Sequence, residues 1–269
     1  MTLTCVTAQI DWLSLGTLVA TLVTALATFW TVLEVKKQRE TSYRPEIYLG
    51  NQQINFYGLK WKDTFLPFSY STEEIKEFND MSCENYINID LHNVGFGVAK
   101  AIEYEWSFDI QRVIESIDQV NHIGFFHVHY DKILEISAPQ IEFKFSHMVT
   151  NQLRKNTVNY ILSSSIEKIA TKINVPSCYI DLYLIFLSSA LNYYSKKSET
   201  KKEVKTHNIE LENFPQLKLK LAYKDLHGKS HSKSFGLRFS FNHLSSPENA
   251  TETRREYGQQ LLVATEITE

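Results

Sequence analysis

The sequence predicts a mainly β protein, an antiparallel sandwich or partly open barrel with two or three short helices, behind one N-terminal transmembrane helix. Three observations lead to this prediction. An uncharged apolar stretch lies near the N-terminus. Several later segments alternate apolar and polar residues with a period of two, which is typical of half-buried antiparallel strands. Most of these segments are joined by turns, and few keep helical spacing.

The apolar stretch runs from Trp12 to Leu33, and none of its 22 residues is Asp, Glu, Lys, Arg or His. A helix of that length is about 33 Å long, close to the hydrocarbon thickness of a bilayer. Trp12 and Trp30 lie near its two ends, where indole rings prefer the membrane interface. We therefore expect residues 12–35 to form one transmembrane helix. A cleaved signal peptide and a buried core helix are the alternatives.

The charges that flank this stretch predict its orientation. Asp11 is the only charged side chain before it, whereas Lys36, Lys37, Arg39 and Arg44 follow it. Lys and Arg accumulate on the cytoplasmic side of a membrane span. The expected location is the inner (cytoplasmic) membrane, with a single pass, the N-terminus outside and the C-terminal part in the cytosol.

Hydroxyl side chains recur along the span at alternating steps of three and four residues, as in a period of 3.5, and we call this set the hydroxyl stripe. It consists of Ser14, Thr17, Thr21, Thr24, Thr28 and Thr31. Gly16 and Ala20 lie beside it as a pair of small residues four positions apart. Transmembrane helices associate through close packing of small residues and interhelical hydrogen bonds, so the pattern predicts self-association or pairing with another membrane protein. Alternatively, each hydroxyl bonds back to its own helix, or the stripe lines a water-filled pore.

Composition limits the remaining function classes. The 269 residues carry a formal net charge of −3, which does not favour nucleic acid as a partner. The three cysteines, Cys5, Cys83 and Cys178, are widely spaced and odd in number. This pattern predicts neither a disulfide framework nor a zinc site, and it is typical of a reducing cytosol. The sequence gives no reason to expect a cofactor.

The expected domain organisation follows from these boundaries. A short extracytoplasmic tail, residues 1–11, precedes the span, and residues 36–45 continue the helix as a juxtamembrane linker that Pro45 ends. Residues 46–244 are expected to form the cytosolic β-rich domain. From about Ser245 the chain is polar without a period, so residues 245–269 are expected to be a disordered tail.

The clearest strands lie on either side of a glycine-containing turn. Residues 86–92 alternate with Ile87, Ile89 and Leu91 on one face, and residues 102–108 alternate in the same way. The turn between them, residues 93–97, contains two glycines, but a strand follows it rather than a helix, so it lacks a phosphate-binding geometry. Residues 217–224 and 235–241 predict a later β-hairpin. Helical spacing predicts a short helix over residues 110–121.

Two further segments are assigned by weaker patterns. Residues 157–173 place Ile161, Leu162, Ile169 and Ile173 at helical spacing and predict a second helix. Residues 178–194 are rich in Tyr, Leu, Ile and Phe, which predicts a long central strand. A second membrane span is the competing interpretation of that segment, but its uncharged part is too short.

Three stretches carry a family resemblance: KKQRETSYRPEIYL after the span, LHNVGFGVAKAIEYEW around the glycine-containing turn, and YKDLHGKSHSKSF in the late hairpin. Together with the short N-terminal span, this arrangement resembles uncharacterised bacterial single-span membrane proteins with a cytosolic β-rich domain. Some of those proteins occur in phage-defence loci. The resemblance implies no chemistry and no catalytic residues.

One cluster of metal-ligand residue types is present. His127, His129 and Asp131 alternate along a predicted strand, so both imidazoles and the carboxylate fall on one face. This spacing resembles the HxHxDH motif of metallo-β-lactamase-like hydrolases, but Lys132 stands where that motif has its next His. The alternative is an ordinary polar strand face.

The sequence therefore predicts a membrane-anchored interaction module, which binds an unknown cytosolic protein or small ligand and oligomerises through its span. One alternative is a membrane-disrupting effector of an anti-phage defence system. Another is a metal-dependent hydrolase that uses His127, His129 and Asp131. Because the sequence contains no P-loop, no G-x-S-x-G elbow and no paired C-x-x-C, a binding role is favoured over an enzymatic one.

Overall fold

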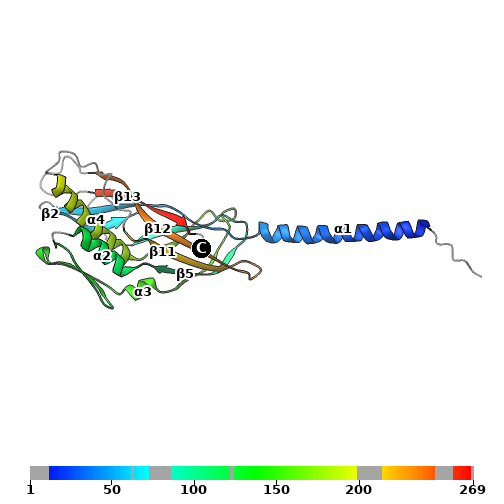
Figure 1. The fold of residues 1–269 in the computed structure, drawn as a ribbon, viewed down its shortest axis with the longest axis horizontal. Helices are drawn as coiled ribbons and strands as arrows, with labels where there is room; N and C mark the ends of the chain where they lie inside the picture. Colours follow the sequence, from blue (N-terminus) through cyan, green and yellow to red (C-terminus); the bar gives the residue numbers. More distant parts are fainter. Residues whose placement is uncertain are drawn as a thin grey trace, which may run out of the picture. The chain divides into compact units, whose positions relative to one another are not determined.

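The computed structural model describes residues 12–61, 64–72, 86–121, 124–198, 214–245 and 257–267. The chain divides into two units, residues 1–44 and residues 45–269 (Figure 1). The described part of the first unit is one helix, and the second unit holds the β-rich domain. The predicted extracytoplasmic tail, residues 1–11, lies outside the described residues.

Helix α1 (Trp12–Ser42) contains the predicted span and most of the predicted linker in one continuous helix. None of its residues is buried, and it is the one described helix long and apolar enough to cross a membrane. Complete exposure of its apolar side chains contradicts the alternative of a buried core helix, because a core helix packs within its own domain. The helix ends shortly before Pro45, as predicted from the proline.

The second unit is mainly β, as predicted, and all strand pairs within its sheets are antiparallel. Its strands are β1 (Ile47–Leu49), β2 (Gln52–Trp61), β3 (Thr64–Ser71), β4 (Ile87–Asn93), β5 (Ala99–Ser107), β6 (His127–Tyr130), β7 (Leu134–Ala138), β8 (Phe143–His147), β9 (Asn156–Ile161), β10 (Thr171–Val175), β11 (Leu217–Lys224), β12 (Ser230–Ser245) and β13 (Tyr257–Glu266). Its helices are α2 (Ile110–Val120), α3 (Val149–Leu153), α4 (Ser177–Ser198) and a short 3₁₀ turn, η2 (Pro139–Ile141).

The described strands form one large and two small sheets. The seven-stranded sheet has the order β3-β2-β13-β12-β11-β5-β9 and curls into a half-barrel. The small sheets have the orders β1-β4-β10 and β6-β7-β8. The half-barrel is the partly open barrel that the alternating segments predict, since each strand presents one apolar face to a common core.

The alternating segments lie where the sequence places them. β4 buries Ile87, Ile89 and Leu91 and leaves the intervening side chains half-buried. β5 begins earlier than predicted, and Ala101, with a positive φ of 49°, lies where the pairing of β5 with β11 shifts register. The short helix predicted over residues 110–121 is confirmed as α2.

Residues 178–194 are helical, so the predicted central strand is wrong. They belong to α4, and from Cys178 to Ala190 every residue except Asp181 is buried. A helix that is buried on all sides carries apolar residues all round and shows no 3.6-residue period. Its many aromatic and β-branched residues then favour a strand on composition alone.

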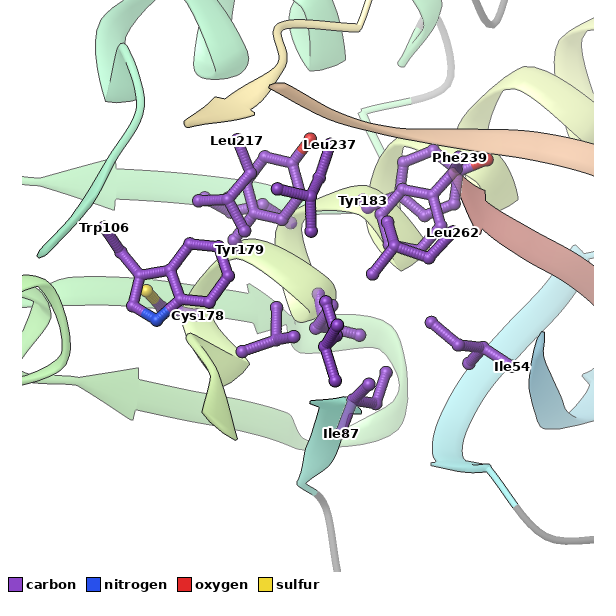
Figure 2. Close-up of a cluster of buried hydrophobic side chains, with 14 of the residues drawn as sticks. Ile54, Ile87, Trp106, Cys178, Tyr179, Tyr183, Leu217, Leu237, Phe239 and Leu262 are labelled. Carbon is purple, nitrogen blue, oxygen red and sulfur yellow. The ribbon is translucent and has the colours of Figure 1, made fainter. Parts of the chain in front are cut away.

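The core forms around α4, where the helix packs against the concave side of the half-barrel. Figure 2 shows Tyr179 and Tyr183 of α4 beside Leu237 and Phe239 of β12. The Tyr183 and Phe239 rings stack with centroids 3.8 Å apart. Ile87 of β4 lies on the other side of this cluster (Figure 2), so the helix is packed between the large sheet and the β1-β4-β10 sheet.

Two other predictions are wrong. Residues 157–173 form β9, a turn and β10 instead of a helix, because Val158 and Ile161 pair with β5. The predicted disordered tail contains β13, which lies between β12 and β2 in the large sheet and buries Leu262. Both assignments depend on partners distant in sequence, and such pairing overrides local pattern.

Candidate functional site

The hydroxyl stripe lies along α1 as predicted, and its threonine hydroxyls bond within the helix. Thr21, Thr24 and Thr28 each donate to the backbone carbonyl four residues earlier, at 2.7–2.8 Å. Thr31 does the same at 2.8 Å, and Thr17 donates to the carbonyl of Ser14 at 2.8 Å. The single chain therefore adopts the back-bonded alternative. The hydroxyl oxygens keep acceptor capacity, so association through the stripe stays a prediction.

The predicted metal-ligand residues lie on β6 and just after it. His127 and His129 are both exposed and share one face of the strand, as their alternation predicts. Across the sheet they face Ser137 and Glu135. Within the described part of the chain, no group of three His, Cys, Asp or Glu side chains is arranged to hold a metal ion. The structure thus does not assemble His127, His129 and Asp131 into a ligand set.

A hollow of about 570 Å³ lies where β5, α2, β11 and β12 meet, and we call it the cationic hollow. Its lining residues are Ser107, Phe108, Asp109, Arg112, Phe214, Pro215, Gln216, Lys218 and Arg238. They come from three separate parts of the sequence, residues 107–112, residues 214–218 and Arg238. A pocket that gathers charged side chains from several elements is a usual place for a ligand.

The cationic hollow has an aromatic floor. Phe214 is buried and Phe108 is half-buried, and both pack on Tyr179 of α4 with ring centroids 5.5 Å and 5.2 Å away. The Tyr179 hydroxyl donates to the carbonyl of Pro215 at 2.8 Å, which fixes the start of β11 over the helix. The floor is therefore anchored to the main core and is rigid.

The walls of the hollow carry three cations and one carboxylate. Arg112, Lys218 and Arg238 are exposed, and Asp109 is the only acidic residue among the described residues that line the hollow. One Asp109 oxygen accepts the backbone N–H of Arg112 at 3.1 Å and caps α2. With its oxygen and nitrogen positions exchanged, the Gln216 amide accepts from the Arg238 guanidinium. The local charge is positive, and the N-terminal amides of α2 add to it.

Arg112 stands in the first turn of α2, where a cation opposes the helix dipole. Lys218 and Lys220 lie on the exposed face of β11, and Lys220 is paired across the sheet with Glu105 of β5. Lys218 is paired with Ser107 instead, so no carboxylate faces it from β5. The positive charges of Arg112 and Lys218 at the hollow therefore serve neither helix capping nor a cross-strand ion pair.

A second polar cluster joins the small sheet β6-β7-β8 to α4. His147 Nε2 lies 2.7 Å from Asp181 Oδ2, which is within ion-pair distance. The geometry does not make this contact a hydrogen bond, because the ring N–H does not point well toward the carboxylate oxygen. The Gln152 amide pairs with the Ser177 hydroxyl and accepts the backbone N–H of Cys178 at 2.9 Å. This cluster caps the start of α4 and leaves no room for a ligand at the fully buried thiol.

Burial sets the ionisation behaviour of this second cluster. It raises the pKa of the Cys178 thiol to about 12, and the nearby Asp181 carboxylate adds to the effect. Burial also raises the pKa of Asp181, while the contact with His147 opposes the increase. A thiol with a raised pKa is a poor nucleophile, so Cys178 carries no activated thiolate.

Comparisons of the chain with protein-family models, with curated proteins and with solved structures found no match.

Sequence reasoning missed the cationic hollow. The alternation in residues 217–224 does place Lys218 on an outer face, and the polar side of the short helix does include Arg112. Nothing in the sequence relates these two positions to Arg238, because only the pairing of β5, β11 and β12 brings them together.

Proposed function

We propose that this protein is a membrane-anchored binding module, whose β-rich domain takes a small anionic ligand in the cationic hollow. The division of the chain into an unburied apolar helix and a compact domain carries this proposal. A helix with 22 uncharged residues and no buried side chain needs an apolar environment that its own domain does not supply. A bilayer provides that environment.

The ligand class follows from the walls and floor of the hollow. Arg and Lys side chains on a rigid aromatic floor favour phosphate or carboxylate groups, and Arg binds such groups with two parallel hydrogen bonds. The hollow offers Arg112 and Arg238 on different elements, so one anion can be held from two directions. A binding role of this kind needs no catalytic residue.

The anchor is tested by fractionation of cells that express the full chain with a C-terminal tag. We expect the protein in the membrane pellet after carbonate extraction, with a mass that includes residues 1–33. Release of the protein into the supernatant would contradict the anchor. A mature mass that lacks these residues would instead support the signal-peptide alternative.

The hollow is tested by calorimetric titration of the detergent-solubilised full chain with inorganic pyrophosphate and with ATP. We expect binding that weakens with added salt and falls at least about ten-fold in the Arg112→Ala, Lys218→Ala double variant, because each lost charge-assisted hydrogen bond costs roughly 1.5–3 kcal/mol. Lys144→Ala, an exposed lysine in another sheet that pairs with Glu135, is the matched control. Equal binding by the double variant would refute the proposed site.

A membrane effector is the second candidate function, and the hydroxyl stripe favours it. An effector requires the spans to assemble, and the stripe with Gly16 and Ala20 offers a regular surface for close helix packing. The resemblance to proteins of phage-defence loci points the same way. Expression of the full chain should then impair membrane potential in a manner that depends on the stripe threonines. The hydrolase alternative is not proposed, because its three ligand residues do not assemble.

A further inference from the structure

Three segments meet at the end of the domain where the chain enters at Pro45, and buried Asn93 holds them together. The Asn93 side-chain oxygen accepts the backbone N–H groups of Glu46 and Gly95, at 3.0 and 3.2 Å. Its amide nitrogen donates to the carbonyls of Gly97 and Ile161, at 2.6 and 3.2 Å. The entry segment, the turn of residues 93–97 and the end of β9 are thus fixed relative to one another.

Backbone contacts extend this junction. Val94 N–H donates to the carbonyl of Glu46 at 2.8 Å, and Ser164 N–H donates to the carbonyl of Asn93 at 2.8 Å. The Ser163 hydroxyl donates to the carbonyl of Gly95 at 2.6 Å. The β11–β12 turn is attached to the same end, because Lys100 at the start of β5 donates to the carbonyl of Leu226. The loops at this end form a fixed surface.

This surface exposes several large apolar side chains to solvent, and we call them the apolar rim. The rim consists of Val94, Phe96, Ile166, Ile169 and Leu226, which are 52–78% exposed. Val94 and Phe96 lie in the turn of residues 93–97, Ile166 and Ile169 lie between β9 and β10, and Leu226 lies in the β11–β12 turn. Fixed loops that expose large apolar side chains together indicate an interaction site, since the surface would otherwise carry polar residues there.

The rim is separate from the cationic hollow. It lies at the N-terminal end of β5, whereas the hollow lies at the C-terminal end of that strand. The eight residue steps of β5 place the two about 26 Å apart. Changes at the rim therefore leave the hollow's contacts unaltered.

Covalent geometry limits how far the rim can lie from a membrane that holds α1. The uncharged stretch ends at Leu33, and the helical residues 34–42 rise about 14 Å beyond it. Residues 43–45 add at most about 10 Å. The polar headgroup layer itself is roughly 5–8 Å thick on each side. Residues 43–45 are therefore long enough to allow the domain's entry end to reach the headgroups.

The charges near the rim suit an anionic bilayer surface. Lys168, Lys172 and Lys229 are exposed at this end, and Glu167 is an exposed carboxylate in the same turn. Lys233 Nζ pairs with the Glu46 carboxylate at 2.7 Å and with the Glu266 carboxylate at 3.0 Å. Basic residues near anionic lipid favour binding, while apolar side chains enter the boundary between headgroups and acyl chains.

We propose that the apolar rim docks on the bilayer surface that anchors α1, which holds the domain in a defined orientation with the cationic hollow facing away from the lipid. The inference rests on the membrane anchor of the proposed function. It adds a second, interfacial contact that fixes the domain's orientation.

The test places a fluorophore on the rim of the full chain reconstituted in vesicles of phosphatidylcholine and phosphatidylglycerol. Phe96→Cys carries the label in a background with Cys5 and Cys83 replaced by Ser, and Cys178 is left because it is fully buried. Gln140→Cys, exposed on η2, is the matched control. With a shallow lipid-borne quencher, we expect quenching at position 96 to be roughly two-fold stronger than at position 140, because rim side chains enter the interface.

The outcomes separate the two proposals. If the labelled protein does not float with the vesicles, the anchor itself has failed. If it floats and positions 96 and 140 are quenched equally, the docking inference is overturned while the anchor stands. Energy transfer between labels at position 96 without lipid quenching would show that a second copy covers the rim, which also overturns the inference. As a second variant, Ile166→Asp with Ile169→Asp should reduce the quenching at position 96 to the control level without loss of flotation.

Discussion

At the residue scale, single polar side chains decide how the loops of the β-rich domain are held. Asn93 is 1% exposed and bonds to three segments of the chain. Asp225 has a similar role in the β11–β12 turn, where it accepts the N–H groups of His227 and Lys229 and contacts His231 at 3.1 Å. Buried polar groups whose hydrogen bonds are all made give a loop one defined conformation.

Asn93→Ala should destabilise the domain by about 3 kcal/mol, because it leaves several buried backbone groups without partners. Chemical denaturation of the full chain in detergent measures the change. Asn174→Ala, at an exposed position in the neighbouring strand β10, is the matched control and should have little effect. A loss of less than roughly 1 kcal/mol for Asn93→Ala would show that the junction is held by other contacts.

The Asp225 turn should be sensitive to acid. Burial acts to raise the pKa of Asp225, but the hydrogen bonds from His231 and from the Lys229 and His227 N–H groups outweigh it and lower the pKa. A carboxyl with a lowered native pKa stabilises the fold above its unfolded pKa of about 4, and this contribution is lost as the pH falls through the native value.

Asp225→Asn should therefore lower the melting temperature by roughly 3 °C at pH 7, for a loss of about 1 kcal/mol. The difference from the wild type should shrink as the pH falls below about 4. Thermal unfolding of both proteins at several pH values measures it. A difference that stays constant with pH would mean that the carboxylate's charge contributes nothing.

At the element scale, α1 and α4 are both apolar but lie in opposite surroundings. α1 has no buried residue, whereas α4 is enclosed between sheets from Cys178 to Ala190. Their sequences differ in the side chains that surround the apolar ones. α1 carries small and hydroxyl residues at regular spacing, which suits helix packing in lipid, and α4 carries Tyr and Phe, which fill a protein core.

Replacement of Thr17, Thr21, Thr24 and Thr28 by Leu should weaken self-association of the span by about 2 kcal/mol, if each interhelical hydrogen bond contributes roughly 0.6 kcal/mol. In the single chain these hydroxyls donate within the helix, so the interhelical bonds would use their oxygens as acceptors or exchange partners. A two-hybrid assay of the isolated span in membranes measures the change.

The control for this experiment changes the opposite side of the helix. Leu22→Ala with Leu26→Ala alters side-chain volume away from the stripe and should leave association unchanged. The Thr→Leu set makes the segment more apolar, so its membrane insertion should be retained or improved. Equal association by the Thr→Leu set and the wild type would reduce α1 to a simple anchor and remove the main support for the effector function.

At the scale of the whole molecule, the proposed function joins an anchor to a binding domain, and it depends on which side of the membrane the domain faces. The basic residues Lys36, Lys37, Arg39 and Arg44 follow the span, and no Lys or Arg precedes it. This asymmetry predicts that the cationic hollow faces the cytosol, where phosphate-bearing ligands are available.

A C-terminal fusion should therefore be active with a reporter that works in the cytoplasm and inactive with one that requires the periplasm. We expect a measurable share of the protein to take the opposite orientation in a variant with a reversed charge asymmetry. In this variant Gln replaces Lys36, Lys37 and Arg39, and two Lys residues are added before Trp12. Activity of the wild-type fusion only with the periplasmic reporter would contradict the predicted topology and place the hollow outside the cytosol.

The sequence by itself determined the features that depend on neighbouring residues. The apolar stretch, the alternation of β4 and of the β11–β12 hairpin, the short helix α2 and the mainly β class all follow from periods and charges within a few residues. Local pattern suffices there because each of these elements presents one face to the core and the other to solvent, or is apolar along an uninterrupted stretch.

Only the tertiary structure decided the rest. α4 was mistaken for a strand because burial on every side removes the helical period, and β13 was mistaken for disorder because its partners β2 and β12 stabilise it from both sides. The cationic hollow and the apolar rim could not be found in the sequence for the same reason. Their residues come from segments far apart in the chain, and they become neighbours only when strand pairing closes the half-barrel around α4.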